Sequence, residues 1–292
     1  MNNTNIRRIL VPVDFSTTGE CAIEYGAYLA DLLHAKLYLL HVVEEIHKYP
    51  YEWSEGTTLT RFEEILRKKL TDKLVKYAEK LTQNHTIQVD FILETGKPSY
   101  KISETVASHG IDLIVMGTHG AHGLEEFFIG SNARKVVDLS PCPVITIRED
   151  FNEKAIKSIV LPIDDSLHSR QKTNNVLPIA KISNAVVHIL GLSQSRKKTD
   201  IDKLNIKIDA IEHHLKDAGL NYTRKVVIGK NLAEEAMNYA QDVNAEMLAI
   251  MADHESDSTG MFMGAFAQQI VNHSPVPVLS IRPHKGLYEY SL

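Results

Sequence analysis

The sequence is poor in cysteine, in tryptophan, in long apolar runs and in any excess of basic charge. Its two cysteines, Cys21 and Cys142, are far apart, which excludes a disulfide framework and a cysteine metal site. Thirty-two Lys and Arg stand against 37 Asp and Glu, a net charge of -5, so the electrostatic signature of a nucleic-acid binder is missing. No apolar run is long enough to span a membrane. We therefore expect neither nucleic acid nor a membrane among the partners.

The amino-terminal stretch also lacks the apolar core and cleavage site of a signal peptide, because its apolar run stops at Asp14. With so few cysteines, this predicts a cytoplasmic protein. What is present is ordinary globular composition, 43% hydrophobic and 24% charged residues. A length of 292 residues fits two domains better than one.

The chain repeats itself. RRILVPVDFST, from Arg7, reappears as KSIVLPIDDSL, from Lys157. DLIVMGTHG from Asp112 matches EMLAIMADH from Glu246, and SPCPVITIRE matches SPVPVLSIRP, both with an offset of 134 residues. The shared offset indicates a duplication, and we expect domains at 1–150 and 151–292.

Each half alternates compact β-rich runs with longer amphipathic stretches, which predicts βαβ units and a parallel sheet. Ser16 and Ser131 are candidate helix N-caps, and Pro98 is a first-turn residue. The predicted strands are 7–13, 36–43, 87–94, 112–117, 143–148, 158–163, 185–192, 222–228, 246–251 and 276–281. The predicted helices are 17–34, 59–84, 98–109, 131–139, 167–183, 200–218, 231–243 and 262–273.

A constellation of glycines follows the strand predicted at 112–117. Gly117 and Gly120 are separated by two residues, and nine more residues lead to Gly130 and Ser131, where a helix begins. Glycines at a strand end allow close backbone approach, and the amides and dipole of a helix start favour phosphate. A turn, tight packing and a simple N-cap would explain the same residues without a ligand.

The spacing G-x2-G-x9-G-[ST] resembles the nucleotide-binding motif of the universal stress protein family, in its ATP-binding branch. VPVDFS, LLHVVEE and SPCPVITI also look like that family, and the repeat is similar to its tandem members. The resemblance implies an α/β fold of two tandem, doubly wound, parallel five-stranded sheets, adenine nucleotide alpha hydrolase-like, with strand order 3-2-1-4-5. The two domains would pair through their last strands as an intramolecular pseudo-dimer. The first and fourth strands would then meet at the switch point, where such sheets bind ligands.

By the same resemblance, the ligand is ATP or AMP, with or without Mg. Asp14 has a second interpretation, since a carboxylate there could cap the next helix near Thr17 and Thr18. The family motif implies contacts with base, ribose and phosphates from ten residues: Pro12, Val13, Asp14, Val42, Met116, Gly117, Gly120, Gly130, Ser131 and Asn132.

The second half departs from the motif. Met251, His254 and Ala265 stand where the first half has Gly117, Gly120 and Ser131, although Gly264 and Asp164 remain. Side chains would fill space that the sugar and phosphates need. We expect one nucleotide per chain, in the first domain.

Other candidates are weaker. The acidic loop 252–260 could hold a metal, although solvated loops are commonly acidic. His119 and His122 read as solvated loop residues, and the cysteines as small packed residues. The aromatic segment around Trp53 reads equally as a lid or an interface patch.

These patterns leave three classes of function open. The first is a stress-response regulator or signalling module that binds an adenine nucleotide and acts on an unknown protein partner, with further homodimerisation left open. The second is a slow ATPase or nucleotidyl-transfer enzyme, although no Walker lysine or arginine finger is recognisable, and no catalytic residue is assigned. The third is a structural stress module that binds no nucleotide.

Overall fold

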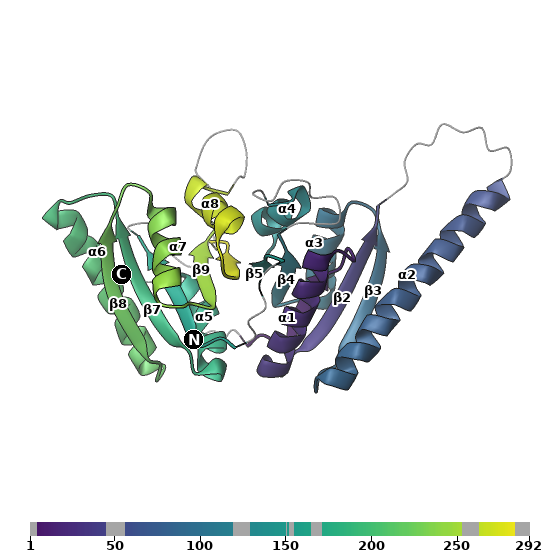
Figure 1. Ribbon diagram of the computed structural model, residues 1–292, viewed down its shortest axis with the longest axis horizontal. Helices are drawn as coiled ribbons and strands as arrows, with labels where there is room; N and C mark the ends of the chain where they lie inside the picture. The colour runs from purple at the N-terminus through teal and green to yellow at the C-terminus, as the bar shows by residue number, and fades with distance from the viewer. Residues whose placement is uncertain are drawn as a thin grey trace.

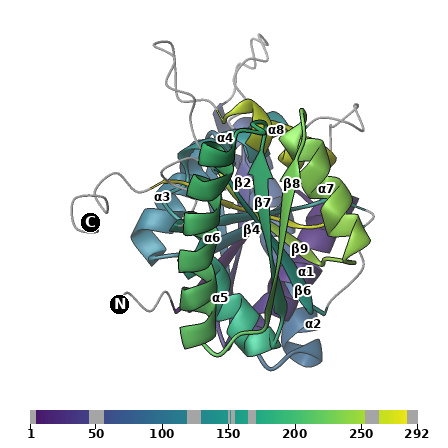
Figure 2. The ribbon, with the colours of Figure 1, turned by 90° about the vertical axis from the view of Figure 1, so that its left-hand side faces the viewer.

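A single twisted sheet of ten strands forms the centre of the molecule (Figures 1 and 2). The structure is a computed structural model, and it describes residues 5–44, 56–118, 129–149, 151, 155–164, 171–252 and 263–283, with backbone only for 56–60. The strand order is β3-β2-β1-β4-β5-β10-β9-β6-β7-β8. All neighbours are parallel except β5 and β10, which pair antiparallel where the two halves meet. Each half thus has the predicted order 3-2-1-4-5, and the predicted pairing through the last strands is confirmed.

The strands end within a few residues of their predicted limits. Most of β1, β4, β6 and β9 is buried on both faces, as expected of central parallel strands. Their bounds are β1 Arg8–Pro12, β2 Lys36–Val43, β3 Val89–Thr95, β4 Leu113–Gly117, β5 Val144–Ile147, β6 Ser158–Ile163, β7 Val186–Ser193, β8 Tyr222–Ile228, β9 Met247–Met251 and β10 Val278–Ile281.

Eight helices formed by the described residues cover the two faces of the sheet. Their bounds are α1 Thr17–Leu33, α2 Gly56–Asn84, α3 Pro98–His109, α4 Ser131–Leu139, α5 Gln171–Ser183, α6 Lys198–Asp217, α7 Leu232–Asp242 and α8 Ala265–His273. One core cluster joins the sheet to α1, α2, α5 and α6, and the other joins it to α3, α4, α7 and α8. Both clusters contain residues of both halves, so the core runs through the junction. Each face buries apolar side chains, which is the main stabilising contribution.

Two of the three predicted helix starts are correct. Ser16 is the N-cap of α1, and its Oγ accepts from Gly19 N at 3.0 Å. Pro98 begins α3. Ser131 was predicted as an N-cap, and this is wrong: Gly130 holds that place with extended backbone, φ -58° and ψ 148°, and Ser131 is already helical.

The duplication is visible in how each half starts its first strand. Asp112 Oδ2 accepts from the backbone amides of Arg7 and Arg8, at 2.8 and 3.0 Å. Glu246 Oε2 accepts from Lys157 N and Ser158 N at 3.0 and 2.7 Å. In both halves an acidic side chain before the fourth strand therefore fixes the beginning of the first.

Candidate functional site at the strand ends of the first half

The first and fourth strands of the first half lie side by side, and their next helices leave on opposite faces. Ile9 pairs with Leu113 and Leu10 with Ile114, a register that, continued, brings Val13 beside Gly117. From these ends α1 packs into one core cluster and α4 into the other. This is the predicted switch point, and nine of the ten predicted residues lie in described parts of the chain. We call these nine the strand-end site: Pro12, Val13, Asp14, Val42, Met116, Gly117, Gly130, Ser131 and Asn132.

Asp14 organises the turn from β1 into α1. Its Oδ1 accepts from Ser16 N at 3.0 Å and from Ser16 Oγ at 2.6 Å, and Ser16 in turn caps α1. Between them, Phe15 adopts φ 61°, a region uncommon for a bulky residue. The carboxylate thus supports the start of the helix through Ser16. Asp14 itself is exposed, just beyond the carboxyl end of the central strand β1.

The main chain of Val13 is held by β2 and by the side chain of His41. Val13 N donates to Leu40 O at 2.7 Å, and His41 Nδ1 lies 2.6 Å from Val13 O, a contact in which the ring nitrogen donates. The His41 ring also packs on Phe15, with centroids 4.6 Å apart. Backbone and side chains fix this side of the strand-end site.

Helix α2 braces the same turn from outside. Tyr77 stacks on Phe15 with centroids 6.2 Å apart, and its hydroxyl donates to Glu20 Oε1 at 2.5 Å. Burial, followed by the hydrogen bond to Glu20, raises the pKa of Tyr77 to about 12. Lys73 Nζ lies 4.7 Å from the centre of the Phe15 ring.

Gly117, at the end of β4, lies against the first turn of α1. A Cβ at this position would be 2.7 Å from Thr18 Cγ2 and 3.2 Å from the Thr18 carbonyl carbon. Thr18 is 4% exposed, and its hydroxyl reaches Glu149 Oε2 at 3.5 Å. The absence of a side chain at position 117 is therefore required for packing, whatever else it permits.

The chain returns to the site at Gly130. Gly130 N donates to Thr118 O at 2.7 Å, and Thr118 N donates to Ile147 O at 2.9 Å, so the segment between 118 and 130 is closed at its base. The N-cap of α4 is a glycine, so it offers no side-chain cap. The first internal bond of α4 is Arg134 N to Gly130 O, which leaves the amides of the three preceding residues, 131–133, without a partner among the described residues. Ser131 is exposed and Asn132 half-buried.

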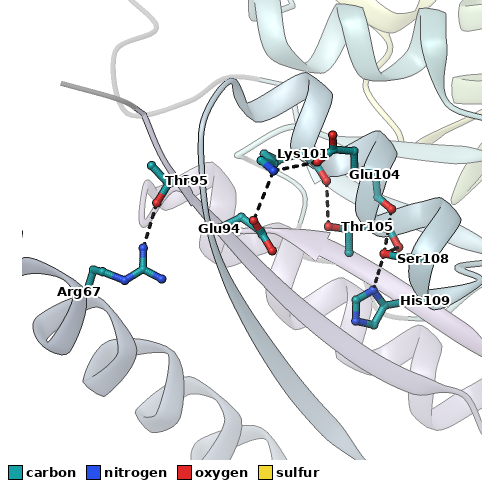
Figure 3. Close-up of polar contacts among 8 residues, drawn as sticks. All are labelled: Arg67, Glu94, Thr95, Lys101, Glu104, Thr105, Ser108 and His109. Atoms are coloured by element: carbon teal, nitrogen blue, oxygen red, sulfur yellow. Dashed lines mark hydrogen bonds and ion pairs between the residues drawn. The ribbon is translucent and has the colours of Figure 1, made fainter. Parts of the chain in front are cut away.

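Val42 lies one strand further out, half-buried against the second core cluster. Beyond Val42, polar contacts surround the end of the outer strand β3 (Figure 3). Arg67 Nη1 donates to Thr95 Oγ1 at 2.9 Å. In the same figure Lys101 lies between Glu94 at 3.5 Å and Glu104 at 2.8 Å. These contacts tie α2 and α3 to the outer strand β3.

Several predicted features lie outside the described residues: Gly120, His119, His122, Trp53, His254 and all but Ala252 of the loop 252–260. Within the described ranges, no group of three or more His, Cys, Asp or Glu side chains could hold a metal ion. No helix there is both long enough and apolar enough to cross a membrane.

Both cysteines are half-buried, and Cys142 packs against the second core cluster. Burial raises the pKa of Cys142 to about 11, so its thiol is protonated at neutral pH. The Cys21 thiol donates to Glu149 O at 3.3 Å.

The second half repeats the backbone of the site with different side chains. Gly264 caps α8 with φ -59° and ψ 156°, nearly the conformation of Gly130, and Ala252 N donates to Ile281 O as Thr118 N does to Ile147 O. Met251, however, fills the position of Gly117 and is 6% exposed. An exposed Ala265 begins α8 in place of Ser131.

Three residues at the site were not singled out from the sequence: Phe15, His41 and Asn272. His41 had a visible signal, a polar residue inside an apolar strand. Asn272 had none, because Ile129 N donates to its Oδ1 at 3.0 Å across 143 residues of chain.

Comparison with known proteins places this geometry in a family. Residues 5–148 and 155–282 each match the universal stress protein family. Universal stress protein MJ0577 of Methanocaldococcus jannaschii is 29% identical over 153 residues, which are 49% of this chain and 94% of that protein. Universal stress protein YxiE of Bacillus subtilis is 29% identical over 148 residues, 48% of this chain and 98% of its own.

Among solved structures, a universal stress protein from Archaeoglobus fulgidus has the same fold over almost the whole molecule. The two superpose with a TM-score of 0.75 at 17% identity, covering 97% of this chain and 99% of that one. Each half of the sequence matches the family, and the ten-stranded sheet contains one five-stranded unit from each half. The chain therefore belongs to the universal stress protein family as a tandem of two such domains.

Proposed function

We propose that the first domain binds one adenine nucleotide, ATP or AMP, at the strand-end site, and that occupancy regulates what the protein presents to a protein partner. The observation that carries this proposal is the start of α4. Three consecutive amides, those of residues 131–133, have no partner among the described residues, and the N-cap glycine offers no side-chain cap. Such amides, together with the positive end of the helix dipole, attract phosphate groups.

The neighbouring strand ends supply the rest of the proposed site. Pro12, Val13 and Asp14 border the base and ribose in this proposal, Val42 meets adenine through its backbone, and Met116 and Gly117 flank the sugar. Gly120, which lies outside the described residues, joins Gly130, Ser131 and Asn132 around the phosphates. Mg²⁺, where present, would neutralise phosphate charge.

The proposed stoichiometry of one nucleotide per chain rests on the difference between the ends of β4 and β9. It does not rest on the starts of α4 and α8, which are alike. Helix α8 begins as α4 does, with an uncapped glycine turn. Met251, by contrast, projects a side chain where Gly117 has none. A backbone that cannot be approached cannot seat a ligand.

The sharpest test is a charge placed at the start of α4. Ser131 is exposed at the first helical position, where an acidic side chain improves helix stability through the dipole. Two unit charges 4 Å apart repel by about 1 kcal/mol in water and about 4 kcal/mol near a protein surface. We expect Ser131→Asp to keep the fold and to weaken ATP binding roughly tenfold or more, measured by isothermal titration calorimetry.

The matched control is Ala265→Asp, the same charge at the equivalent exposed position of α8. It should leave affinity and a stoichiometry of one unchanged. A wild-type protein that neither retains nucleotide on purification nor binds added ATP or AMP contradicts the proposal. Two equivalents per chain contradict the assignment to the first domain alone. Turnover assays on the same samples separate a regulator from a slow ATPase.

A further inference from the structure

The segment that leads into α4 is fixed from both domains at once. Gly130 N donates to Thr118 O of its own domain at 2.7 Å. The preceding amide, Ile129 N, donates to Asn272 Oδ1 of α8 in the second domain at 3.0 Å, and this contact is buried. Figure 1 shows α4 and α8 close together over the middle of the sheet. The first helical amides of α4 follow directly after these two.

We propose that Asn272 is a positioning residue for the anionic ligand of the first domain, so that the second domain forms part of the first domain's site. This inference rests on the proposed function, because it names a further residue of the same site. Asn272 does not touch the ligand. It fixes the junction from which the amides of 131–133 project.

The side-chain amide of Asn272 suits this positioning role because it is buried and uncharged. Asn272 is 6% exposed, so its carbonyl oxygen offers a firm hydrogen-bond acceptor with little competition from water. A buried amide N–H without an acceptor is costly, by about 1–3 kcal/mol, so the Ile129 contact strongly restricts the junction. Asparagine provides this acceptor without adding negative charge next to a helix start that would receive phosphate.

The equivalent residue in the other half is charged. The offset of 134 that relates the halves takes position 138 to position 272, and position 138 is an aspartate that is 6% exposed. Asp138 and Asn272 are the next-to-last residues of α4 and α8. The neutral residue of the pair is therefore the one that contacts the domain that keeps the glycine motif.

The test compares three variants of the full chain. Asn272→Ala removes the acceptor, Asn272→Asp keeps an acceptor but adds charge, and Asp138→Asn is the matched control at the equivalent position. Nucleotide affinity is measured by calorimetry, and order at the junction by hydrogen exchange of backbone amides over 129–137. Thermal unfolding checks that each variant folds.

We expect Asn272→Ala to speed exchange at 129–134 and to weaken ATP binding at least fivefold. Asn272→Asp should weaken ATP binding at least as much, because it adds a negative charge in a buried position next to the helix start. Asp138→Asn should change neither readout. If Asn272→Ala does not fold, Asn272→Asp decides the question alone.

The proposal is overturned if both Asn272 variants bind ATP like the wild type. It is also overturned if Asp138→Asn weakens binding equally, because the effect would then be one of general pairing between the domains. A wild-type chain that binds no nucleotide refutes the proposed function itself. Exchange at 129–134 then still reports whether Asn272 orders the junction.

Discussion

Replacing Gly117 by alanine separates packing from ligand binding at the strand-end site. A Cβ there would be 2.7 Å from Thr18 Cγ2 and 3.2 Å from the Thr18 carbonyl carbon. The first contact lies well inside van der Waals distance, and the second involves main chain that cannot rotate away. Helix α1 must move, and overpacking of this kind costs about 1–3 kcal/mol. The lower entropy of unfolded alanine returns about 0.5 kcal/mol, so we expect a net loss of about 1–2 kcal/mol.

Thr18→Ser supplies the matched second mutation. It removes the methyl group that meets the new Cβ and keeps the hydroxyl that reaches Glu149. In a double-mutant cycle followed by urea unfolding, Thr18→Ser should reduce the cost of Gly117→Ala by at least about 0.5 kcal/mol. Gly219→Ala is the control: a Cβ at Gly219 meets nothing within 4 Å, and only its φ of 73° strains the variant. Thr18→Ser should not rescue it.

The same variants also show how Gly117 affects nucleotide affinity. If affinity is lost in Gly117→Ala and returns in the double variant, Gly117 acts through the seating of α1. If affinity stays low in a stable double variant, the new methyl group obstructs the ligand. A Gly117→Ala protein as stable as the wild type, or a cost that Thr18→Ser leaves unchanged, refutes the packing argument.

Three further predictions concern stability. Tyr25 is 4% exposed and its hydroxyl has no hydrogen-bond partner among the described residues, so Tyr25→Phe should leave the urea midpoint unchanged or raise it. The pKa of Tyr77 is raised to about 12 in the folded protein, from a value near 10 in the unfolded chain. The contribution of Tyr77 to the free energy of unfolding is therefore complete below pH 10 and is lost as pH rises through 12. We expect the stability difference between wild type and Tyr77→Phe to shrink between about pH 8 and pH 11.5. Asp112→Ala removes the acceptor of two backbone amides and should cost about 1–3 kcal/mol in urea unfolding.

Each of these has a contrary outcome. A clear loss of stability in Tyr25→Phe would mean that the hydroxyl is hydrogen-bonded. A wild-type to Tyr77→Phe difference that is constant across the alkaline range would show that burial and the Glu20 hydrogen bond do not raise the pKa of Tyr77. Glu246→Ala is the internal reference for Asp112→Ala, since it removes the same device from the other half, and unequal losses would show that the halves differ in how their first strands are fixed.

Much of the fold was readable from the sequence because its signals are local. Compact apolar, β-rich runs indicated the strands, and Ser16 and Pro98 marked helix starts because the one caps the first turn and the other suits it. Ser131 was misplaced by one residue, because a serine and a glycine side by side both favour a cap. The division at residue 150 stays a prediction.

At the site, spacing brought the correct stretches together but could not say what each residue does. Gly117 was read as a gap for a ligand, yet its nearest neighbour is Thr18, 99 positions earlier in the chain. Asp14 was read as a ligand contact or as a cap near Thr17 and Thr18, and the sequence did not indicate its hydrogen bonds to Ser16. Tertiary contacts of this kind leave no periodic trace in the sequence. Whether the ten predicted residues contact a nucleotide awaits the binding experiments.

The antiparallel junction of β5 and β10 has a consequence for how the two halves can diverge. In a dimer of identical subunits every substitution occurs on both sides of the twofold axis. An interface residue must then be compatible with both symmetry-related contacts at once. Here one gene product supplies both sides, and each can change alone. Met251 at the position equivalent to Gly117, and Asn272 at the position equivalent to Asp138, are differences that a symmetric assembly could not contain.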